Sequence, residues 1–199
     1  VLVKETLAHS GSYAGIIVID TLGNILYDSS FVYEEAVLSP NGELLAWVVD
    51  TVLKIVRVAD GSTVTTISTS DPMRIQFLCL SFSHDGRLLA AGESRKGSAL
   101  TRAFVSIVDA ESGELITRIE PTPAKLSDRH QMYHLKWTTD DSRLIIGGDF
   151  VCVIDMRGLS VSCLYPLKEF QYVGGLDLSP DDRYVAYHVM SEDSIRVLD

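Results

Sequence analysis

Three short segments carry residue types that could do chemistry, and each lacks a group that the chemistry needs. His130 and His134 are four residues apart, with Asp128 close by, a spacing that could place two metal ligands on one face. Residues 92–98 (GESRKGS) resemble a phosphate loop, but the required lysine after the second glycine is missing and no helix is expected to follow. Residues 11–15 (GSYAG) place Tyr13 where a nucleophile elbow needs serine. We therefore predict no catalytic residue, no metal site and no cofactor, so this chain by itself is not an enzyme, whatever a longer parent protein does.

Composition and charge exclude several classes of protein. Of the 199 residues, 46% are hydrophobic and 22% are charged, which excludes a disordered tail. The longest purely apolar stretches, such as residues 16–19, are far shorter than the roughly 20 residues of a membrane-spanning helix. The net charge of −10 is unfavourable for binding nucleic acid or an anionic membrane, so neither is predicted as a partner.

Cysteine usage gives an expectation about the compartment. Cys79, Cys152 and Cys163 are odd in number, form no CxxC pair and lie inside apolar runs. This pattern favours buried, unpaired thiols in a reducing compartment over a disulfide framework. Because this stretch also contains no signal or transmembrane segment, the predicted location is the cytoplasm.

A repeated hairpin organises the chain. The motif LSPNGELLA begins at Leu38, and related copies follow, 44, 55 and 41 residues further along in turn, as FSHDGRLLA from Phe82, WTTDDSRLII from Trp137 and LSPDDRYVA from Leu178. The pairs Asn41-Gly42 and Asp85-Gly86 tolerate the positive φ of a tight turn between two apolar strands. The pairs at 140–141 and 181–182 are both Asp-Asp, and we expect them to serve the same turn less well, because aspartate tolerates positive φ less freely than glycine.

A second repeated unit is an apolar strand that ends in aspartate. Its copies end at Asp20, Asp60, Asp109, Asp155 and Asp199, and a glycine follows each of the first four within a few residues. An aspartate in this place can accept backbone N–H groups in an Asx-turn. Since the same residue recurs at every strand end, we predict a structural turn role for all five.

The two units alternate and predict an all-β chain of four-stranded antiparallel sheets repeated radially. Counting strands gives three complete units and two partial ones, 18 strands in all, because residues 1–30 lack a first strand and residues 167–199 lack a fourth. The predicted divisions of this single domain are residues 1–30, 31–70, 71–120, 121–166 and 167–199. Such an arc does not close, so we predict a piece of a larger propeller, with seven blades as the working hypothesis.

The repeated hairpin and the strand-end aspartate resemble the blades of WD-repeat β-propellers over essentially the whole chain. No Gly-His pair precedes the first strand of any repeat and no tryptophan precedes the strand-end aspartates, so the family's buried His–Asp–Ser–Trp network is not assembled here. Only Asp149 and Asp193 lie near the family's aspartate position. The propellers of serine peptidases and the quinoprotein-like and lactonase-like propellers resemble the repeats about as well.

The resemblance implies an interaction scaffold that binds partners through the loops around the central channel. Two long interruptions, residues 93–102 and 121–131, and a third loop, residues 166–172, belong to these connections and predict an acidic or phosphorylated peptide partner. The predicted partner-binding residues are Arg95, Lys96, Arg102, Lys125, Arg129, His130, Lys168, Phe170 and Tyr172. Further partners would be the remaining blades of the parent propeller, or a second copy associating through exposed blade edges. The alternative function is the propeller domain of a larger enzyme.

Overall fold

The computed structural model describes residues 2–6, 15–20, 22–29, 35–49, 51–68, 75–96, 101–121, 132–167, 171–190, 192 and 194–199, and the structural statements below concern these residues. They form eighteen β-strands, the number expected from the repeats. None of them lies in a helix long and apolar enough to cross a membrane.

Three of the sheets contain four antiparallel strands in chain order. The first of these comprises β4 (Glu35–Leu38), β5 (Leu44–Val49), β6 (Val52–Arg57) and β7 (Thr63–Ser68). The next comprises β8 (Ile75–Phe82), β9 (Leu88–Lys96), β10 (Thr101–Asp109) and β11 (Leu115–Ile119). The last comprises β12 (Met132–Trp137), β13 (Arg143–Gly148), β14 (Phe150–Asp155) and β15 (Ser160–Pro166).

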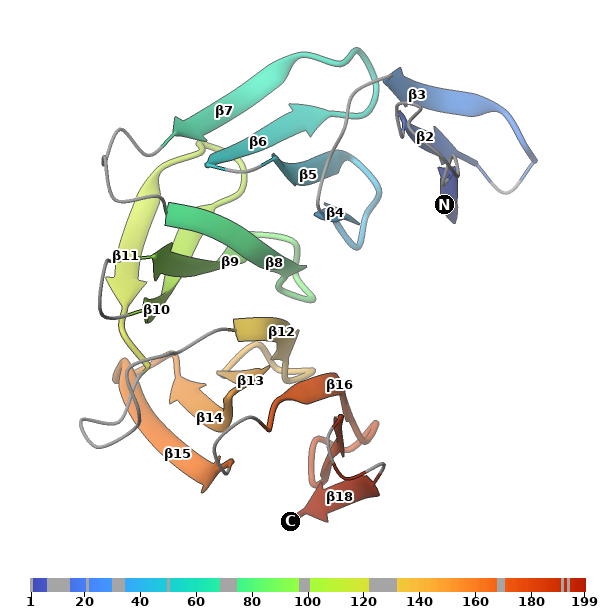
Figure 1. Cartoon of the computed structure of the whole chain (residues 1–199). Coiled ribbons are helices and arrows are strands. Elements are labelled where there is room, and N and C mark those ends of the chain that lie inside the picture. The colour runs from blue at the N-terminus through green and yellow to red at the C-terminus, as the bar shows by residue number, and fades with distance from the viewer. Residues whose placement is uncertain are drawn as a thin grey trace.

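A three-stranded sheet stands at each end of this series. One comprises β1 (Leu2–Thr6), β2 (Gly15–Ile19) and β3 (Ile25–Ser29), and the other comprises β16 (Val173–Leu178), β17 (Val185–Val189) and β18 (Ser194–Leu198). Figure 1 shows the five sheets following one another round an open arc, with β4, β8, β12 and β16 on its inner side. The predicted partial propeller of three complete and two partial blades is therefore confirmed, and we number the blades 1 to 5 along the chain.

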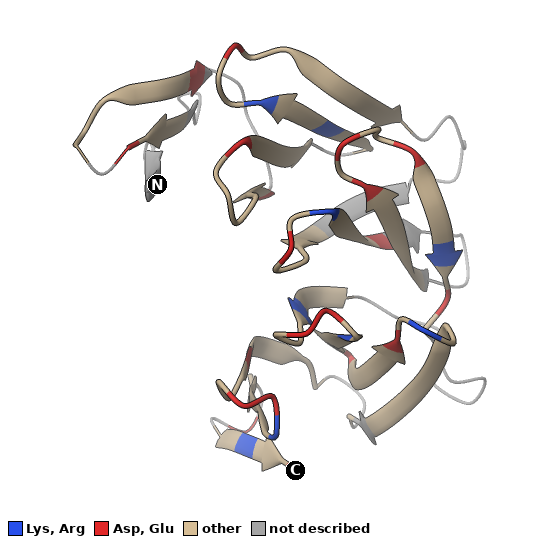
Figure 2. Cartoon of the chain, turned by 180° about the vertical axis from the view of Figure 1, so that it is seen from behind, with Lys and Arg blue, Asp and Glu red and all other residues tan. Residues whose placement is uncertain are grey.

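Because the strands are antiparallel, the connections emerge at two opposite edges of the blades. One edge, which we call the hairpin face, carries the turns between first and second strands and between third and fourth strands. The other edge, the loop face, carries the turns between second and third strands and the connections from one blade to the next. Figure 2 shows that many of the described acidic residues lie in hairpin-face turns.

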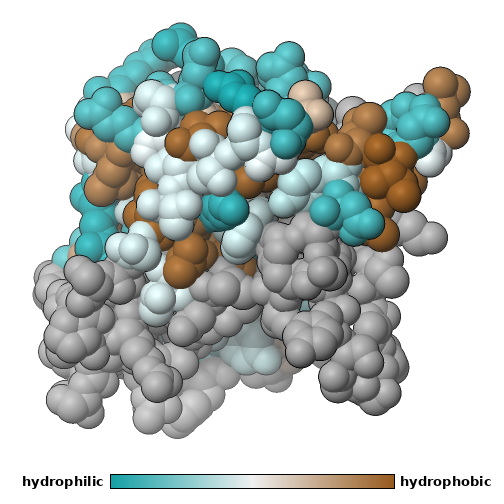
Figure 3. All heavy atoms as spheres, turned by 90° about the horizontal axis from the view of Figure 1, so that it is seen from above, coloured by the Kyte–Doolittle hydropathy of each residue, from teal (hydrophilic) through white to brown (hydrophobic). Residues whose placement is uncertain are grey.

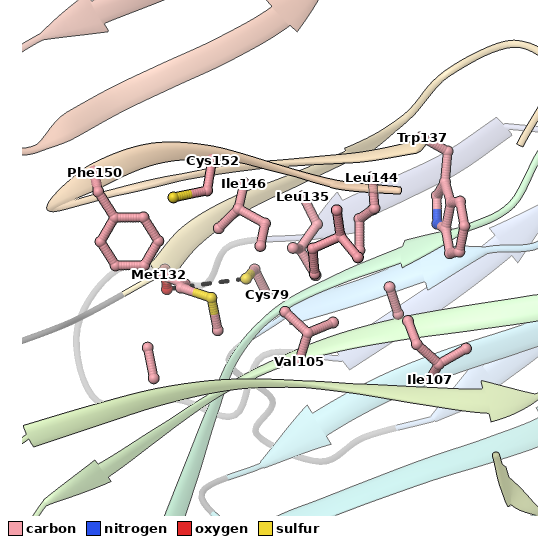
Figure 4. Close-up of a cluster of buried hydrophobic side chains, with 13 residues drawn as sticks. Cys79, Val105, Ile107, Met132, Leu135, Trp137, Leu144, Ile146, Phe150 and Cys152 are labelled. Atoms are coloured by element: carbon pink, nitrogen blue, oxygen red, sulfur yellow. Dashed lines mark hydrogen bonds between the residues drawn. The ribbon is translucent and has the colours of Figure 1, made fainter. Parts of the chain in front are cut away.

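The core consists of four apolar layers, each between two neighbouring blades. Leu44 and Ala46 face blade 3, while Leu45 and Trp47 on the same strand face blade 1. This two-sided burial explains why the second strands read as continuous apolar runs rather than as alternating ones. Figure 4 shows the layer between blades 3 and 4, where Val105 and Ile107 of β10 lie opposite Leu135, Leu144 and Ile146.

The same hydrogen-bond pattern closes all four hairpin turns. In blade 3 the Ser83 hydroxyl donates to Asp85 Oδ1 (2.7 Å) and accepts the Leu88 N–H (2.9 Å), while the Arg87 N–H donates to Asp85 Oδ1 (2.9 Å). In blade 4 the hydroxyls of Ser142 and Thr138 and the Ser142 N–H donate to Asp140, and these bonds lower the pKa of that carboxyl to about 2. A small hydroxyl residue and an Asn or Asp two positions later therefore make the side-chain hydrogen bonds that form this turn.

The second aspartate of each Asp-Asp pair does something that the sequence analysis missed. Asp141 and Asp182 adopt φ of 56°, as the turn requires, but their carboxylates also bind the preceding blade. Asp141 accepts the backbone N–H groups of His84 (2.7 Å) and Asp85 (2.9 Å). Asp182 accepts the backbone N–H (2.7 Å) and hydroxyl (2.5 Å) of Thr139. We call these contacts the aspartate clamps.

The clamps follow a rule that is visible in the sequence. Where the preceding turn offers an N–H at its second position, as at His84 and Thr139, the next blade carries aspartate. Where the preceding turn has Pro40, which has no N–H, the next blade carries Gly86, whose added Cβ would lie 3.7 Å from the Pro40 ring.

Replacing Asp141 with glycine should lower the free energy of unfolding by about 1–2 kcal/mol, because two hydrogen bonds to a charged acceptor between blades are lost while the positive φ becomes easier. Urea unfolding measures the change. Leu159→Gly is the matched control, since Leu159 also has positive φ (50°) and its side chain is exposed. The control should be neutral or slightly stabilising, and an equal loss in both variants would contradict the clamp.

Candidate interaction surface

The predicted basic residues are only partly within the described structure. Arg95 and Lys96 end β9 and Arg102 lies near the start of β10, so the expected loop over residues 93–102 is wrong at its two ends. Both strands are nine residues long and stay paired as far as Lys96 and Thr101, extending the hairpin beyond the length of the other blades. The side chains of these residues, and all of Lys125, Arg129, His130, Lys168 and Phe170, lie outside the described part of the chain.

A buried carboxylate supports the base of this long hairpin. Glu93, with 4% of its side chain exposed, accepts the Ser106 hydroxyl and pairs with the Arg118 guanidinium. Arg118 also lies over the Phe104 ring, 4.4 Å from the centroid. Burying Glu93 alone would be costly, so this network holds β9, β10 and β11 together where the hairpin leaves the blade.

The first strands of blades 3, 4 and 5 share a β-bulge at the loop-face end. The register shifts between Phe77 and Cys79, between Met132 and His134, and between Val173 and Gly175, so one extra residue stands at the same place in each blade. The extra residues are Leu78, Tyr133 and Gly174. All three bulges stand in the innermost strands of their blades, on the inner side of the arc (Figure 1).

One side chain near the start of each first strand contacts the next blade. It is Glu35 in blade 2 and, one residue after the bulge, Cys79 in blade 3 and His134 in blade 4. Glu35 accepts the Leu80 N–H (3.2 Å), and the Cys79 thiol lies 3.9 Å from the Met132 carbonyl oxygen. His134 is hydrogen-bonded to the backbone of Val173, and its partial burial lowers the pKa of its imidazole. These side chains therefore link neighbouring blades, and within the described residues no group of three or more His, Cys, Asp or Glu could hold a metal ion.

Glu35 should make stability depend on pH. Burial raises the pKa of its carboxyl from 4.5 to about 7, so the folded chain keeps a proton that the unfolded chain has lost. Stability should therefore fall as pH rises from 4.5 to about 7 and then level off. Glu35→Gln should remove this slope and raise the free energy of unfolding at pH 8 by about 1–2 kcal/mol.

Urea unfolding between pH 4 and pH 8 tests the pH dependence expected of Glu35. The exposed Glu111→Gln is the control, and a slope that persists in E35Q would rule Glu35 out as its source.

Two tyrosines meet on the loop face between blades 4 and 5. Tyr133 is the bulged residue of β12, and Tyr172 ends the connection into β16. Their ring centroids are 5.8 Å apart and the rings are tilted by 55°. Tyr172 is 40% exposed, whereas Tyr133 is half-buried. Burial raises the pKa of the Tyr133 hydroxyl, with Asp149 and Tyr172 contributing less. Tyr172 is thus the one predicted partner-binding residue whose side chain is described.

Four of the five strand-end aspartates lie in turns of the opposite, hairpin face. Asp20 accepts the N–H groups of Leu22 and Asn24 (both 2.8 Å), and Asp109 accepts that of Ser112 (2.8 Å). Asp60 and Asp155 accept N–H groups two residues further along, at 2.9 Å. The Asn24 side-chain amide contributes most to lowering the pKa of Asp20, the Ser62 hydroxyl to lowering that of Asp60, and the Ser112 N–H to lowering that of Asp109. Asp199 instead accepts hydrogen bonds from the Arg183 guanidinium.

The cysteines correct the sequence analysis. Cys152 and Cys163 form a disulfide, and Cys79 is free and buried. The two residues are direct partners across β14 and β15, with Cα atoms 4.1 Å apart. Their pairing followed from strand register, which spacing along the chain does not reveal.

Comparison with solved structures decides the architecture. The chain superposes on NirN, a dihydro-heme d1 dehydrogenase solved in complex with DHE, with a TM-score of 0.70 at 14% identity. The match covers 93% of this chain and 39% of the other, whose fold there is a β-propeller. The fold is that of a β-propeller. The propeller chain described here spans about two fifths of the length of NirN, and at this identity the likeness concerns the fold alone. No protein-family model and no curated protein sequence matches the chain.

Proposed function

We propose that this propeller segment is a non-catalytic interaction scaffold that binds a protein or peptide on its loop face. One observation carries the proposal. The described acidic side chains of the hairpin face are largely engaged in turns and aspartate clamps, whereas the loop face carries a partly exposed tyrosine pair between blades 4 and 5 and, on blade 3, a hairpin longer than those of the other blades. Tyrosine is favoured at protein interfaces. We regard the repeats as a divergent form of the WD repeat.

The partner proposed for the basic residues is an acidic or phosphorylated peptide. Residues 74–143 contain 10 basic and 9 acidic residues, while the rest of the chain is strongly acidic. Amide chemical shifts during titration with a glutamate–glycine peptide test the proposal. We expect a change at Thr101, the partner of Lys96 across the hairpin, that disappears when Arg95, Lys96 and Arg129 are replaced by glutamate. Unchanged binding by this triple variant would overturn the assignment of the basic residues.

The second candidate is the propeller domain of a larger enzyme, which the likeness to NirN favours, because that structure carries an enzyme's name and is much longer. The sequence that flanks this chain in its gene separates the two functions. A hydrolase domain or a cofactor-bearing domain beside the propeller would favour the enzyme.

Exposed apolar residues on the two end blades support a further partner, which we propose to be another blade. Ile195 (75% exposed) and Val197 (61%) lie on the outer face of blade 5, and Leu22 and Ile25 lie on blade 1. Figure 3 shows hydrophobic surface at the end that blade 1 forms. Light scattering over a range of concentrations tests whether these faces pair two copies. A compact monomer at all concentrations would exclude that form of association.

The disulfide changes the proposal about compartment. Cytoplasmic location was predicted from three unpaired cysteines, and two of them are paired. Structural disulfides persist in oxidising compartments, which we therefore propose for the segment that contains Cys152 and Cys163.

A further inference from the structure

The tyrosine pair stands where three blade elements meet on the loop face. The bulge at the start of β12 sets Tyr133 beside the connection that ends at Tyr172. The turn between β13 and β14 contributes Asp149, whose charge reaches the Tyr133 hydroxyl. Two aromatic faces and a carboxylate therefore come from separate elements of blade 4 and from its connection to blade 5.

Two described carboxylates stand on the loop face near the pair, those of Asp149 and Glu192. Glu192, in the turn between β17 and β18, accepts a hydrogen bond from Gln171 (2.6 Å), next to Tyr172 in the same connection, and also pairs with Arg196. An aromatic face attracts a cation through its quadrupole, and a neighbouring carboxylate strengthens that attraction.

We propose that Tyr133, Tyr172 and Asp149 form a recognition site for a lysine or arginine side chain of a partner protein. The inference rests on the proposed function and adds a partner chemistry to it. The assignment reverses the prediction for Tyr172, which the sequence analysis grouped with Lys168 in a loop expected to bind an acidic peptide. The site is separate from the blade 3 hairpin and prefers the opposite charge. A partner that spans both would present acidic residues to blade 3 and a basic residue to the junction of blades 4 and 5.

Titration of the isotope-labelled chain with two matched peptides, one of alternating lysine and glycine and one of alternating glutamate and glycine, tests this site. We expect the lysine peptide to shift the backbone amides of Tyr133, Asp149 and Tyr172. Tyr172→Ala should weaken its binding about two- to fivefold, while Tyr172→Phe, which keeps the aromatic face, should bind like the parent chain. Tyr184→Ala is the control, because Tyr184 is 37% exposed but lies on the hairpin face.

The outcomes separate this site from the proposed function. If the lysine peptide shifts the acidic hairpin turns as much as the loop face, and Y172A binds like the parent, its binding is general electrostatic attraction and the inference is wrong. If only the glutamate peptide shifts loop-face amides, the inference is wrong while the proposed function stands. If neither peptide shifts any loop-face amide, both fall.

Discussion

Gly113→Ala should lower the free energy of unfolding by about 2–4 kcal/mol, one of the two largest effects expected of a small change in this chain. Gly113 lies in the turn between β10 and β11 with φ of 74°. A Cβ atom there would lie 2.3 Å from Cβ of Thr65 and 2.8 Å from both its Cγ2 and Oγ1. Since Thr65 belongs to β7 of the preceding blade, an alanine would have to push two blades apart or displace the turn.

Gly61→Ala separates the two causes of that loss, which are the contact with Thr65 and the strain of an alanine at positive φ. Gly61 occupies the corresponding turn of blade 2 with φ of 70°, but the nearest atom to its added Cβ is a ring carbon of Tyr27 at 3.7 Å. G61A should therefore cost only the backbone strain, about 1 kcal/mol. Urea unfolding of both variants measures the difference, and G113A should cost less in a Thr65→Gly background, which lacks the Cβ that the alanine would meet. Equal losses at the two glycines would show that backbone strain alone matters.

The fold could be predicted because the same turn and strand pattern recurs in every blade. Each hairpin turn needs a hydroxyl residue and an Asn or Asp, so the motif survives wherever the turn does. The strand count and the two short end blades followed from the order of the motifs. The sequence also contains a signal for the aspartate clamps, because Asp-Asp replaces Asp-Gly in the two blades that follow a turn with an available N–H at its second position. That signal is legible only when neighbouring repeats are compared with each other.

The interaction surface was predicted less well, for reasons of geometry. Net charge identified the basic segments, but it did not show that β9 and β10 continue through residues 93–96 and 101–102. The contact of Tyr133 with Tyr172 depends on a bulge of one residue, and a bulge leaves no fixed mark in a strand sequence. A long-range pair of this kind depends on how two blades pack, whereas a hairpin turn depends on five or six consecutive residues.

Removing the Cys152–Cys163 disulfide should lower the free energy of unfolding by about 3 kcal/mol, because a bond that joins residues 11 apart restricts the unfolded chain by roughly that amount. The bond closes the hairpin of β14 and β15, whose inner residues pack into the layer between blades 3 and 4. Urea unfolding with and without a reducing agent measures the loss without introducing a cavity.

Counting thiols in the unfolded chain tests independently whether Cys152 and Cys163 form a disulfide. Purified without reducing agent, the chain should present one thiol, that of Cys79, and three after reduction. Cys79→Ala should present none before reduction and should stay as sensitive to the reducing agent as the parent chain, since Cys79 contacts Met132 and takes no part in the bond. Three thiols before reduction, with no change in stability afterwards, would return all three cysteines to the free state that their spacing first indicated and would remove the argument for an oxidising compartment.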